Sequence, residues 1–166
     1  MGYVIGGELI LKVSVKKVIN FIFFLKSHSQ CQYKILVDLC GVDYPEKKKR
    51  FEVVYNILSI AHNHRLCITA AVDEIMPVDS IVNVFSGADW FEREAWDMLG
   101  IFFVDHGDLR RILTDYGFRG HPLRKDFPLT GYVEARYDDI EKRIVTEKVS
   151  LTQAHRVFCF NSTWLG

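Results

Sequence analysis

Three short apolar segments with alternating side chains follow one another in the first half of the chain, and they constrain the fold most. They span residues 34–40, 51–60 and 66–72. Each has the length and the β-branched or aromatic content of a strand, and the two connections between them are short. Antiparallel neighbours need only such short connections. The sequence therefore predicts an antiparallel meander, with Ile35, Val37 and Leu39 on one face of its first strand.

A helix is predicted before the meander. Apolar residues recur at helical spacing from residue 15 to about residue 28, while residues 8–15 form either a short strand or the start of this helix. Phe21, Phe23 and Phe24 lie outside the apolar stripe. They indicate either a helix that is buried on more than one side or a helix partly covered by a partner. Burial on more than one side is the favoured interpretation.

A second helix is predicted from about residue 89 to Gly100, where glycine suits a left-handed stop. Asp89 and Glu92 have the spacing of a capping box, and Arg93 and Asp97 have that of an i, i+4 ion pair. The apolar stripe of this helix comprises Phe91, Ala95, Met98 and Leu99. A shorter helix is predicted just before it, at residues 78–85.

Regular periodicity stops after Gly100, because prolines and glycines interrupt the chain. Extended segments are predicted at residues 132–137, 143–149 and 155–160. The predicted fold class is α+β, a small mixed or antiparallel sheet with helices packed on it, followed by an extended, turn-rich C-terminal tail. Residues 1–104 are expected to form the core domain. Residues 105–166 are expected to form an interface segment and tail that belong to the same structural unit.

Charge and cysteine content exclude several classes of function. The 21 basic residues balance 21 acidic ones, so no overall field favours nucleic acid or anionic lipid. No cysteine belongs to a C-x-x-C pair, which leaves a zinc ribbon, a redox dithiol or an iron–sulfur run unsupported. Reduced, structural thiols are expected for Cys31, Cys40, Cys67 and Cys159. No apolar run approaches the roughly 20 residues that a membrane span needs.

The chemical groups between residues 90 and 126 allow a catalytic site or an interaction surface. An acid–base pair is conceivable among Glu92, Glu94, Asp97 and His106. However, no nucleophile elbow, dinucleotide fingerprint or phosphate-binding glycine loop accompanies it. Residues 105–126 carry five Arg or Lys and four Asp, and aromatic residues lie among them. Paired charges with aromatic rings are typical of a protein–protein contact, so an interaction surface is favoured.

This stretch closely resembles the sequence pattern of the 30-kDa subunit of respiratory complex I, which is called subunit 9 when it is encoded in the mitochondrion. The matching residues are Glu92-Arg93-Glu94, Asp97, Met98-Leu99, His106, Arg110, Ile112-Leu113, the block 109–129, and the segments 38–45 and 50–55. The resemblance covers about residues 32–160. Gly107 stands where the family usually has proline, and residues 1–31 match poorly.

The resemblance implies a non-catalytic subunit of the hydrophilic arm, which supports assembly of the module that transfers electrons from NADH to ubiquinone. It implies that FMN, the iron–sulfur clusters and ubiquinone are bound by other subunits. The implied partners are the 49-kDa-type quinone-site subunit and neighbouring iron–sulfur subunits, without nucleic acid and with only indirect membrane contact. The implied interface or structural residues are Glu92, Arg93, Glu94, Asp97, His106, Arg110, Arg111, Arg124, Lys125 and Asp126.

The expected location is the matrix side of the mitochondrial inner membrane. Glu8 comes early and arginine is absent before Arg50, which disfavours a cleavable mitochondrial leader and favours an organelle-encoded chain. The cytoplasmic face of a bacterial membrane is the alternative. A stand-alone acid–base enzyme, or an anion-binding module built on the basic residues of 105–126, remains the alternative function.

Overall fold

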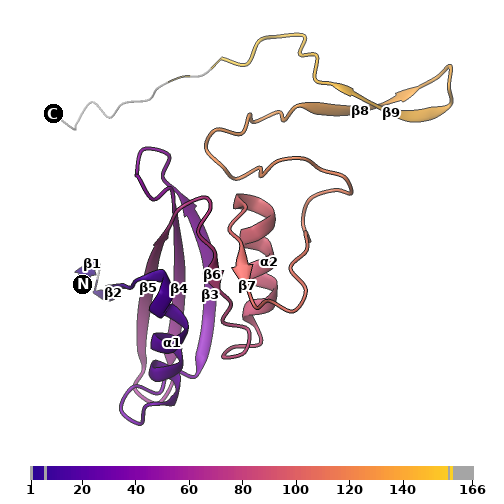
Figure 1. Ribbon diagram of the computed structural model, residues 1–166. Helices are drawn as coiled ribbons and strands as arrows, with labels where there is room; N and C mark the ends of the chain where they lie inside the picture. Colours follow the sequence, from indigo (N-terminus) through magenta and orange to yellow (C-terminus); the bar gives the residue numbers. More distant parts are fainter. Residues whose placement is uncertain (1, 6, 157, 159–166) are drawn as a thin grey trace. The chain divides into compact units, whose positions relative to one another are not determined.

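The computed structural model describes residues 2–5, 7–156 and 158, in two compact units, Met1–Phe127 and Pro128–Gly166 (Figure 1). The boundary between the units follows Phe127, whereas the sequence suggested that the core domain ends at residue 104. Residues 105–127 belong with the core because hydrogen bonds tie them to the second helix and to the sheet.

A five-stranded mixed sheet forms the centre of the first unit. Its strands are β1 (Gly2–Ile5), β2 (Glu8–Lys12), β3 (Ile35–Asp43), β4 (Phe51–Ser59) and β5 (His64–Val72). The spatial order is β1-β2-β5-β4-β3. The predicted antiparallel meander is confirmed for β3, β4 and β5, while β2 runs parallel to β5. Residues 8–15 therefore begin as a strand rather than as part of a helix.

The register of β3 changes partway along the strand. A bulge lies between Leu36 and Asp38, where the pairing with β4 shifts by one residue. Since a bulge moves the following side chains to the opposite face, Leu39 is buried while Ile35 and Val37 are 37% and 41% exposed. The expectation that all three share one face is therefore wrong.

The first helix, α1 (Val18–Ser27), follows a 3-10 turn at Val15–Lys17. Its buried stripe of Val18, Ile22 and Leu25 joins the core. Phe23 and Phe24 are 60% and 49% exposed, so the helix is buried on one side only. The favoured interpretation of burial on more than one side is thus wrong.

The second helix, α2 (Ala88–Leu99), lies beside the edge strand β3 (Figure 1). Residues 78–85 do not form the expected helix. Instead, β6 (Val78–Asp79) pairs in parallel with β7 (Phe103–Val104), and a turn leads from β6 into α2. Backbone bonds from β6 to the chain beyond α2 compete with helical ones, which local sequence spacing does not reveal.

The second unit contains an antiparallel hairpin, formed by β8 (Val133–Asp138) and β9 (Arg143–Lys148). It confirms the two extended segments predicted there. Residues 155, 156 and 158 are described and belong to no strand, while the rest of the segment predicted at 155–160 lies outside the described residues. Among the described residues, no helix is long and apolar enough to cross a membrane.

Candidate functional site

Glu92 is fully buried on the inner side of α2, against the chain that follows β6. Its carboxylate accepts hydrogen bonds from the Ser80 hydroxyl at 2.7 Å and from the Ile81 N–H at 2.8 Å. Burial raises the pKa of Glu92, and the two bonds and nearby His106 lower it by less. The buried hydroxyl of Tyr55 has no hydrogen-bond partner among the described residues. Its pKa is raised, first by burial and then by the negative charge of Glu92.

The predicted capping box is absent from α2. Gly87 occupies the N-cap position, with no side-chain cap bond, and Asp89 lies in the first turn of the helix. Glu92 does not bond back to the start of the helix because its two oxygens receive Ser80 and Ile81. The Asp–x–x–Glu spacing is therefore used for tertiary contacts.

His106 completes the polar cluster at the start of α2, and its side chain is fully buried. Its Nδ1 accepts the Asp108 N–H at 3.1 Å. Since an accepting Nδ1 places the ring proton of the neutral imidazole on Nε2, that nitrogen donates toward Asp89, with 3.3 Å to the carbonyl and 3.2 Å to Oδ1. Glu92 Oε2 is 3.9 Å from the same nitrogen. The ring thus joins the loop after β7 to α2.

Asp97 is the second fully buried carboxylate of α2. Its Oδ2 accepts three backbone N–H groups, from Ile112, Leu113 and Thr114, at 3.2, 2.8 and 2.9 Å. The Thr114 hydroxyl donates to Oδ1 at 2.8 Å, and Arg111 Nη1 lies 3.5 Å from that atom. Burial alone raises the pKa of Asp97, but these hydrogen bonds leave it below its usual value.

Arg93 does not form the predicted ion pair with Asp97. Its Nε donates to the Arg110 carbonyl at 3.3 Å, and its guanidinium lies over the Trp90 ring. Arg93 and Asp97 therefore both connect α2 to the loop at residues 110–114. The i, i+4 spacing of Arg93 and Asp97 on the helix could not indicate that each side chain bonds to the distant segment at residues 110–114 instead of to the other.

The C-terminal end of α2 is capped by residues 121–124. Gly100 has the predicted left-handed conformation, with φ 80°, and its N–H bonds to the Trp96 carbonyl. The next three carbonyls of the helix each accept one hydrogen bond. His121 Nδ1 donates to the Asp97 carbonyl at 3.0 Å, the Leu123 N–H to that of Met98 at 3.1 Å, and Arg124 Nε to that of Leu99 at 2.7 Å. These contacts satisfy carbonyls that a helix end leaves unpaired. Burial lowers the pKa of His121, which keeps its ring neutral.

An ion network around Arg50 holds the chain just before the boundary between the units. Arg50 makes a two-pronged contact with Asp43 at 2.8 and 3.0 Å and also reaches Glu74 at 2.6 Å and Asp126 at 2.9 Å. Asp43 accepts the Lys125 N–H at 2.8 Å as well. The bonds from Arg50 lower the pKa of Asp43 despite its burial. Sequence reasoning missed Arg50 and Asp43, because Glu74, Lys125 and Asp126 meet them only in the folded chain.

The predicted residues divide into two groups. Most of them contact their own chain: Glu92, Arg93, Asp97, His106, Arg111, Arg124 and Asp126. Glu94, Arg110 and Lys125 are exposed, and Arg110 pairs with the exposed Asp108 at 2.9 Å.

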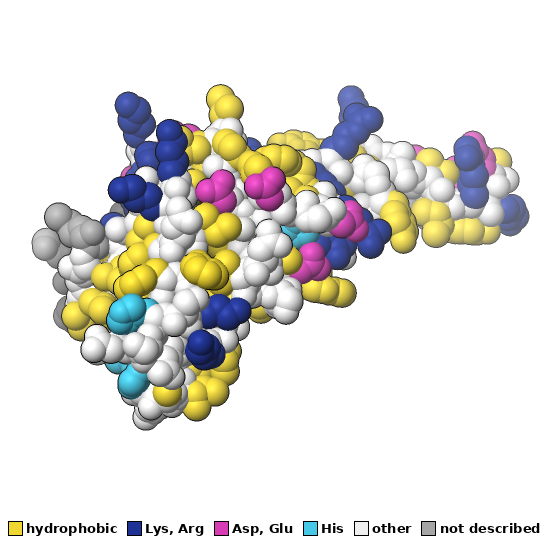
Figure 2. Space-filling model, turned by 60° about the horizontal axis from the view of Figure 1, so that its bottom comes forward, with side chains coloured by type: hydrophobic (Ala, Val, Ile, Leu, Met, Phe, Trp, Pro, Cys, Tyr) yellow, Lys and Arg dark blue, Asp and Glu magenta, His cyan; other side chains and the backbone are white. Residues whose placement is uncertain are grey.

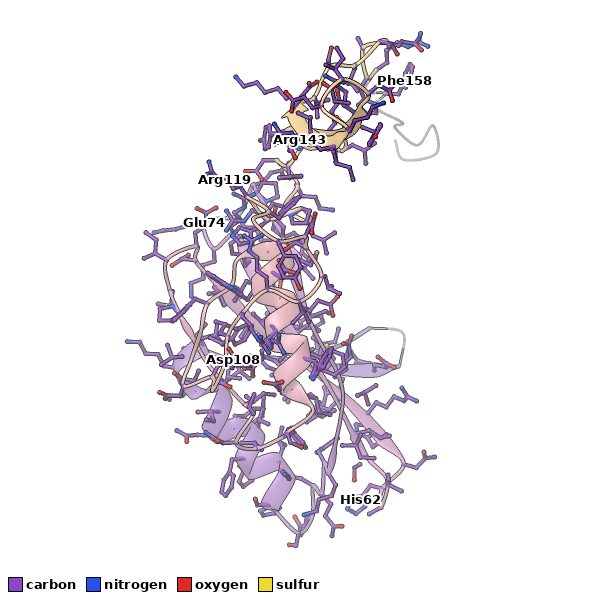
Figure 3. All side chains as sticks on the ribbon, turned by 90° about the vertical axis from the view of Figure 1, so that its right-hand side faces the viewer. His62, Glu74, Asp108, Arg119, Arg143 and Phe158 are labelled. Atoms are coloured by element: carbon purple, nitrogen blue, oxygen red, sulfur yellow. The ribbon has the colours of Figure 1, made fainter. Side chains whose placement is uncertain are left out.

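The described residues include no group of three or more His, Cys, Asp or Glu side chains that could hold a metal. His62 lies at the tip of the β4–β5 hairpin, at the opposite end of the sheet from Glu74 (Figure 3). This placement agrees with the short connection predicted between the segments at 51–60 and 66–72, and Asn63 there has φ 46°. Cys31, Cys40 and Cys67 are free thiols.

Comparisons with known proteins agree with the resemblance. The chain matches the family described as "Respiratory-chain NADH dehydrogenase, 30 Kd subunit" over residues 11–133. NADH-ubiquinone oxidoreductase subunit 9 of Reclinomonas americana is 58% identical over 158 residues, covering 95% of this chain and 78% of that relative. A bacterial relative, an NADH-quinone oxidoreductase subunit of Paramagnetospirillum magneticum, is 58% identical over 160 residues, covering 96% and 80%.

A plant relative, NADH dehydrogenase [ubiquinone] iron-sulfur protein 3 of Solanum tuberosum, is 57% identical over 141 residues, covering 85% of this chain and 74% of its own length. These relatives support a subunit of a respiratory complex and not the stand-alone enzyme or anion-binding module that the sequence left as alternatives. The chain therefore belongs to the family of the 30-kDa subunit of respiratory complex I, the NADH:ubiquinone oxidoreductase.

Proposed function

We propose that this chain is a non-catalytic core subunit of the hydrophilic arm of complex I, where it supports the assembly and stability of the module that transfers electrons from NADH to ubiquinone. One observation carries this proposal. The acid–base candidates Glu92, Asp97 and His106 are engaged in contacts that hold α2 to its surroundings, while the fourth candidate, Glu94, is exposed on the helix. These three engaged groups position the backbone rather than face a substrate.

The chain is proposed to bind neither flavin nor an iron–sulfur cluster, although some plant relatives bear the name "iron-sulfur protein 3". Iron–sulfur clusters are held mainly by cysteine thiolates gathered at one site. Cys31 follows α1, Cys40 lies in β3 and Cys67 lies in β5, and burial raises the pKa of the latter two thiols. A raised thiol pKa opposes the thiolate form that ligates metal. The described cysteines do not fit such a cluster.

The partners of the chain are other subunits of complex I. More finely, we propose the 49-kDa-type quinone-site subunit and the neighbouring iron–sulfur subunits, with no nucleic acid and only indirect membrane contact. The exposed Glu94, Arg110 and Lys125 are the predicted residues best placed to meet a neighbour. Arg111 and Arg124 are assigned instead to holding α2, because their guanidinium groups already contact Asp97 and the Leu99 carbonyl.

Relatives occur in mitochondria and in bacteria. We propose that the chain faces the matrix in the mitochondrial case. In a bacterium, the corresponding position would be the cytoplasmic face of the membrane. Labelling from either side of intact inner-membrane vesicles would distinguish the two faces of the membrane.

The variant His106→Ala tests the non-catalytic role within the whole complex. Losing the bonds to Asp89 and Asp108 should lower the amount of assembled complex on native electrophoresis. The NADH:ubiquinone turnover per assembled complex should stay unchanged. Arg119→Ala is the control, because Arg119 is exposed (Figure 3) and should affect neither quantity. A tenfold lower turnover per complex, with a normal amount of complex, would indicate a catalytic role for His106.

A further inference from the structure

The β8–β9 hairpin has one apolar face and one charged face. Strand register places Tyr137 opposite Ile144 and Val133 opposite Lys148. Because side chains alternate along a strand, one face carries Val133, Ala135, Tyr137, Ile144, Thr146 and Lys148. The other face carries Glu134, Arg136, Asp138, Arg143, Val145 and Glu147. Figure 2 shows hydrophobic side chains along one side of this hairpin and basic side chains on another.

The charged face is satisfied within the hairpin, whereas the apolar face is open. Arg136 lies 2.7 Å from Glu147 and 3.6 Å from Asp138. On the apolar face, Val133 and Tyr137 are each 56% exposed and Ile144 is 71% exposed. A hollow bordered by Val133, Lys148, Val149 and Leu151 continues this surface toward the base of the hairpin.

A two-stranded hairpin is only marginally stable in water unless its apolar face packs against something else. The second unit provides no such cover, since none of its described residues belongs to the buried apolar core of the chain, which runs from Val15 to Phe103. A contiguous exposed apolar patch bordered by polar residues marks a protein-interaction site. The hairpin therefore has the composition of a segment that is stabilised by its binding partner.

We propose that the face containing Val133, Tyr137 and Ile144 docks onto an apolar strip of a sister subunit of complex I, with a carboxylate of that subunit opposite Lys148. This inference rests on the proposed function and names the surface that it would use. Among the strand residues of the described hairpin, Lys148 is the only charged side chain on this face, so a matching partner needs one acidic group at that end. The same hairpin face of a second copy of this chain offers no acidic group. A different protein of the complex is therefore the matching occupant.

Two variants at neighbouring positions of β9 provide a matched test. Ile144→Asp places a charge on the apolar face, while Val145→Asp places the same charge on the opposite face, across from Arg136. In cells that express each variant as the sole copy of the chain, Ile144→Asp should lower the amount of assembled complex roughly tenfold, as the loss of a central interface residue does. Val145→Asp should assemble normally. Equal assembly of both variants would overturn the proposal.

Crosslinking separates loss of docking from loss of folding. A photo-crosslinking phenylalanine analogue at Tyr137 should form an adduct with one other subunit of complex I, identified by mass spectrometry. The same analogue at Arg143, on the charged face, should form none. Adducts with this chain's own residues 1–127, with a second copy, or with no protein would overturn the docking surface. The proposed function fails separately if cells lacking the chain assemble a complex with normal NADH:ubiquinone turnover.

Discussion

Asp97 joins α2 to two parts of the chain that follows β7, one through its side chain and one through its backbone. Its carboxylate gathers the successive N–H groups of residues 112–114, while its backbone carbonyl accepts the His121 ring. A charged acceptor makes stronger hydrogen bonds than a neutral one, and the three N–H groups would otherwise need other partners. The path of the chain after β7 therefore depends on the ionised form of this residue.

The substitution Asp97→Asn should destabilise the protein by about 2 kcal/mol at pH 7, because the amide offers one acceptor oxygen where the carboxylate offers two. Since hydrogen bonding lowers the pKa of folded Asp97, its contribution is present above the unfolded-state pKa and is lost as pH falls through the folded-state value. The difference between variant and wild type should shrink toward pH 3. Urea unfolding followed by tryptophan fluorescence measures it; a difference that does not change with pH would contradict the assignment.

Glu92 should show the opposite pH dependence. Its folded-state pKa is raised, chiefly by burial, so its contribution is fully present below the unfolded-state pKa and is lost as pH rises through the folded-state value. In Glu92→Gln, the amide oxygen can accept the Ile81 N–H and the NH2 group can donate to Ser80 Oγ. The variant should cost about 1 kcal/mol or less at pH 7 and more at pH 4. A larger cost at pH 7 than at pH 4 would rule out this explanation.

Sequence patterns identified the important residues of α2 but not their contacts. The Asp89–Glu92 and Arg93–Asp97 spacings match known local motifs, yet Glu92 and Asp97 bond to segments before and after the helix. Local spacing describes only what an isolated helix would do. Arg50 was missed for the same reason, because Asp43, Glu74 and Asp126 approach it only after the sheet has formed. Pairing between distant segments is invisible in a single sequence.

At the scale of elements, α2 and β3 pack so closely that a glycine is required between them. A Cβ atom added at Gly41 would lie 2.4 Å from Leu99 Cδ1 and 2.9 Å from Ile101 Cδ1. Both of these side chains are buried in the core, so they have little room to move. The close packing of α2 against β3 thus depends on the lack of a side chain at Gly41.

The variant Gly41→Ala should therefore lower the free energy of unfolding by about 1–3 kcal/mol, the usual cost of overfilling a packed core. The matched control is Gly107→Ala, since an added Cβ at Gly107 meets nothing within 4 Å. Urea denaturation of the two purified variants provides the comparison. Equal stability of both would mean that the helix and the strand separate without cost.

Element positions were largely predictable, whereas the face that each element buries was less so. The strands β3, β4, β5, β8 and β9 and both helices lie where periodicity and turn residues indicated. Periodicity could not anticipate the bulge in β3, which reverses the exposure of Ile35 and Val37. It also mistook residues 78–85 for a helix, because a two-residue strand such as β6 is specified by its neighbour and not by its own pattern.

At the scale of the whole molecule, the first unit contains the complete buried apolar core of the described residues, from Val15 to Phe103. The segment up to Phe127 adds polar contacts to it, chiefly through Asp97, Arg124 and the Arg50 network. The sequence predicted the fold class. It could not locate the boundary between the units, because the contacts that hold residues 105–127 involve residues as distant as Asp43.

A chain ending at Phe127 should therefore fold but fail to function in the complex. Its core and the caps of α2 are intact, so its urea midpoint should match that of the full chain, and unfolding should remain cooperative. Without the hairpin, it should not enter complex I on native electrophoresis. Ending the chain instead at residue 104 removes the hydrogen-bond donors to the Asp97 carboxylate and to the last carbonyls of α2. This shorter chain should not unfold cooperatively. If both truncated chains unfolded alike, residues 105–127 would not be part of the folded core.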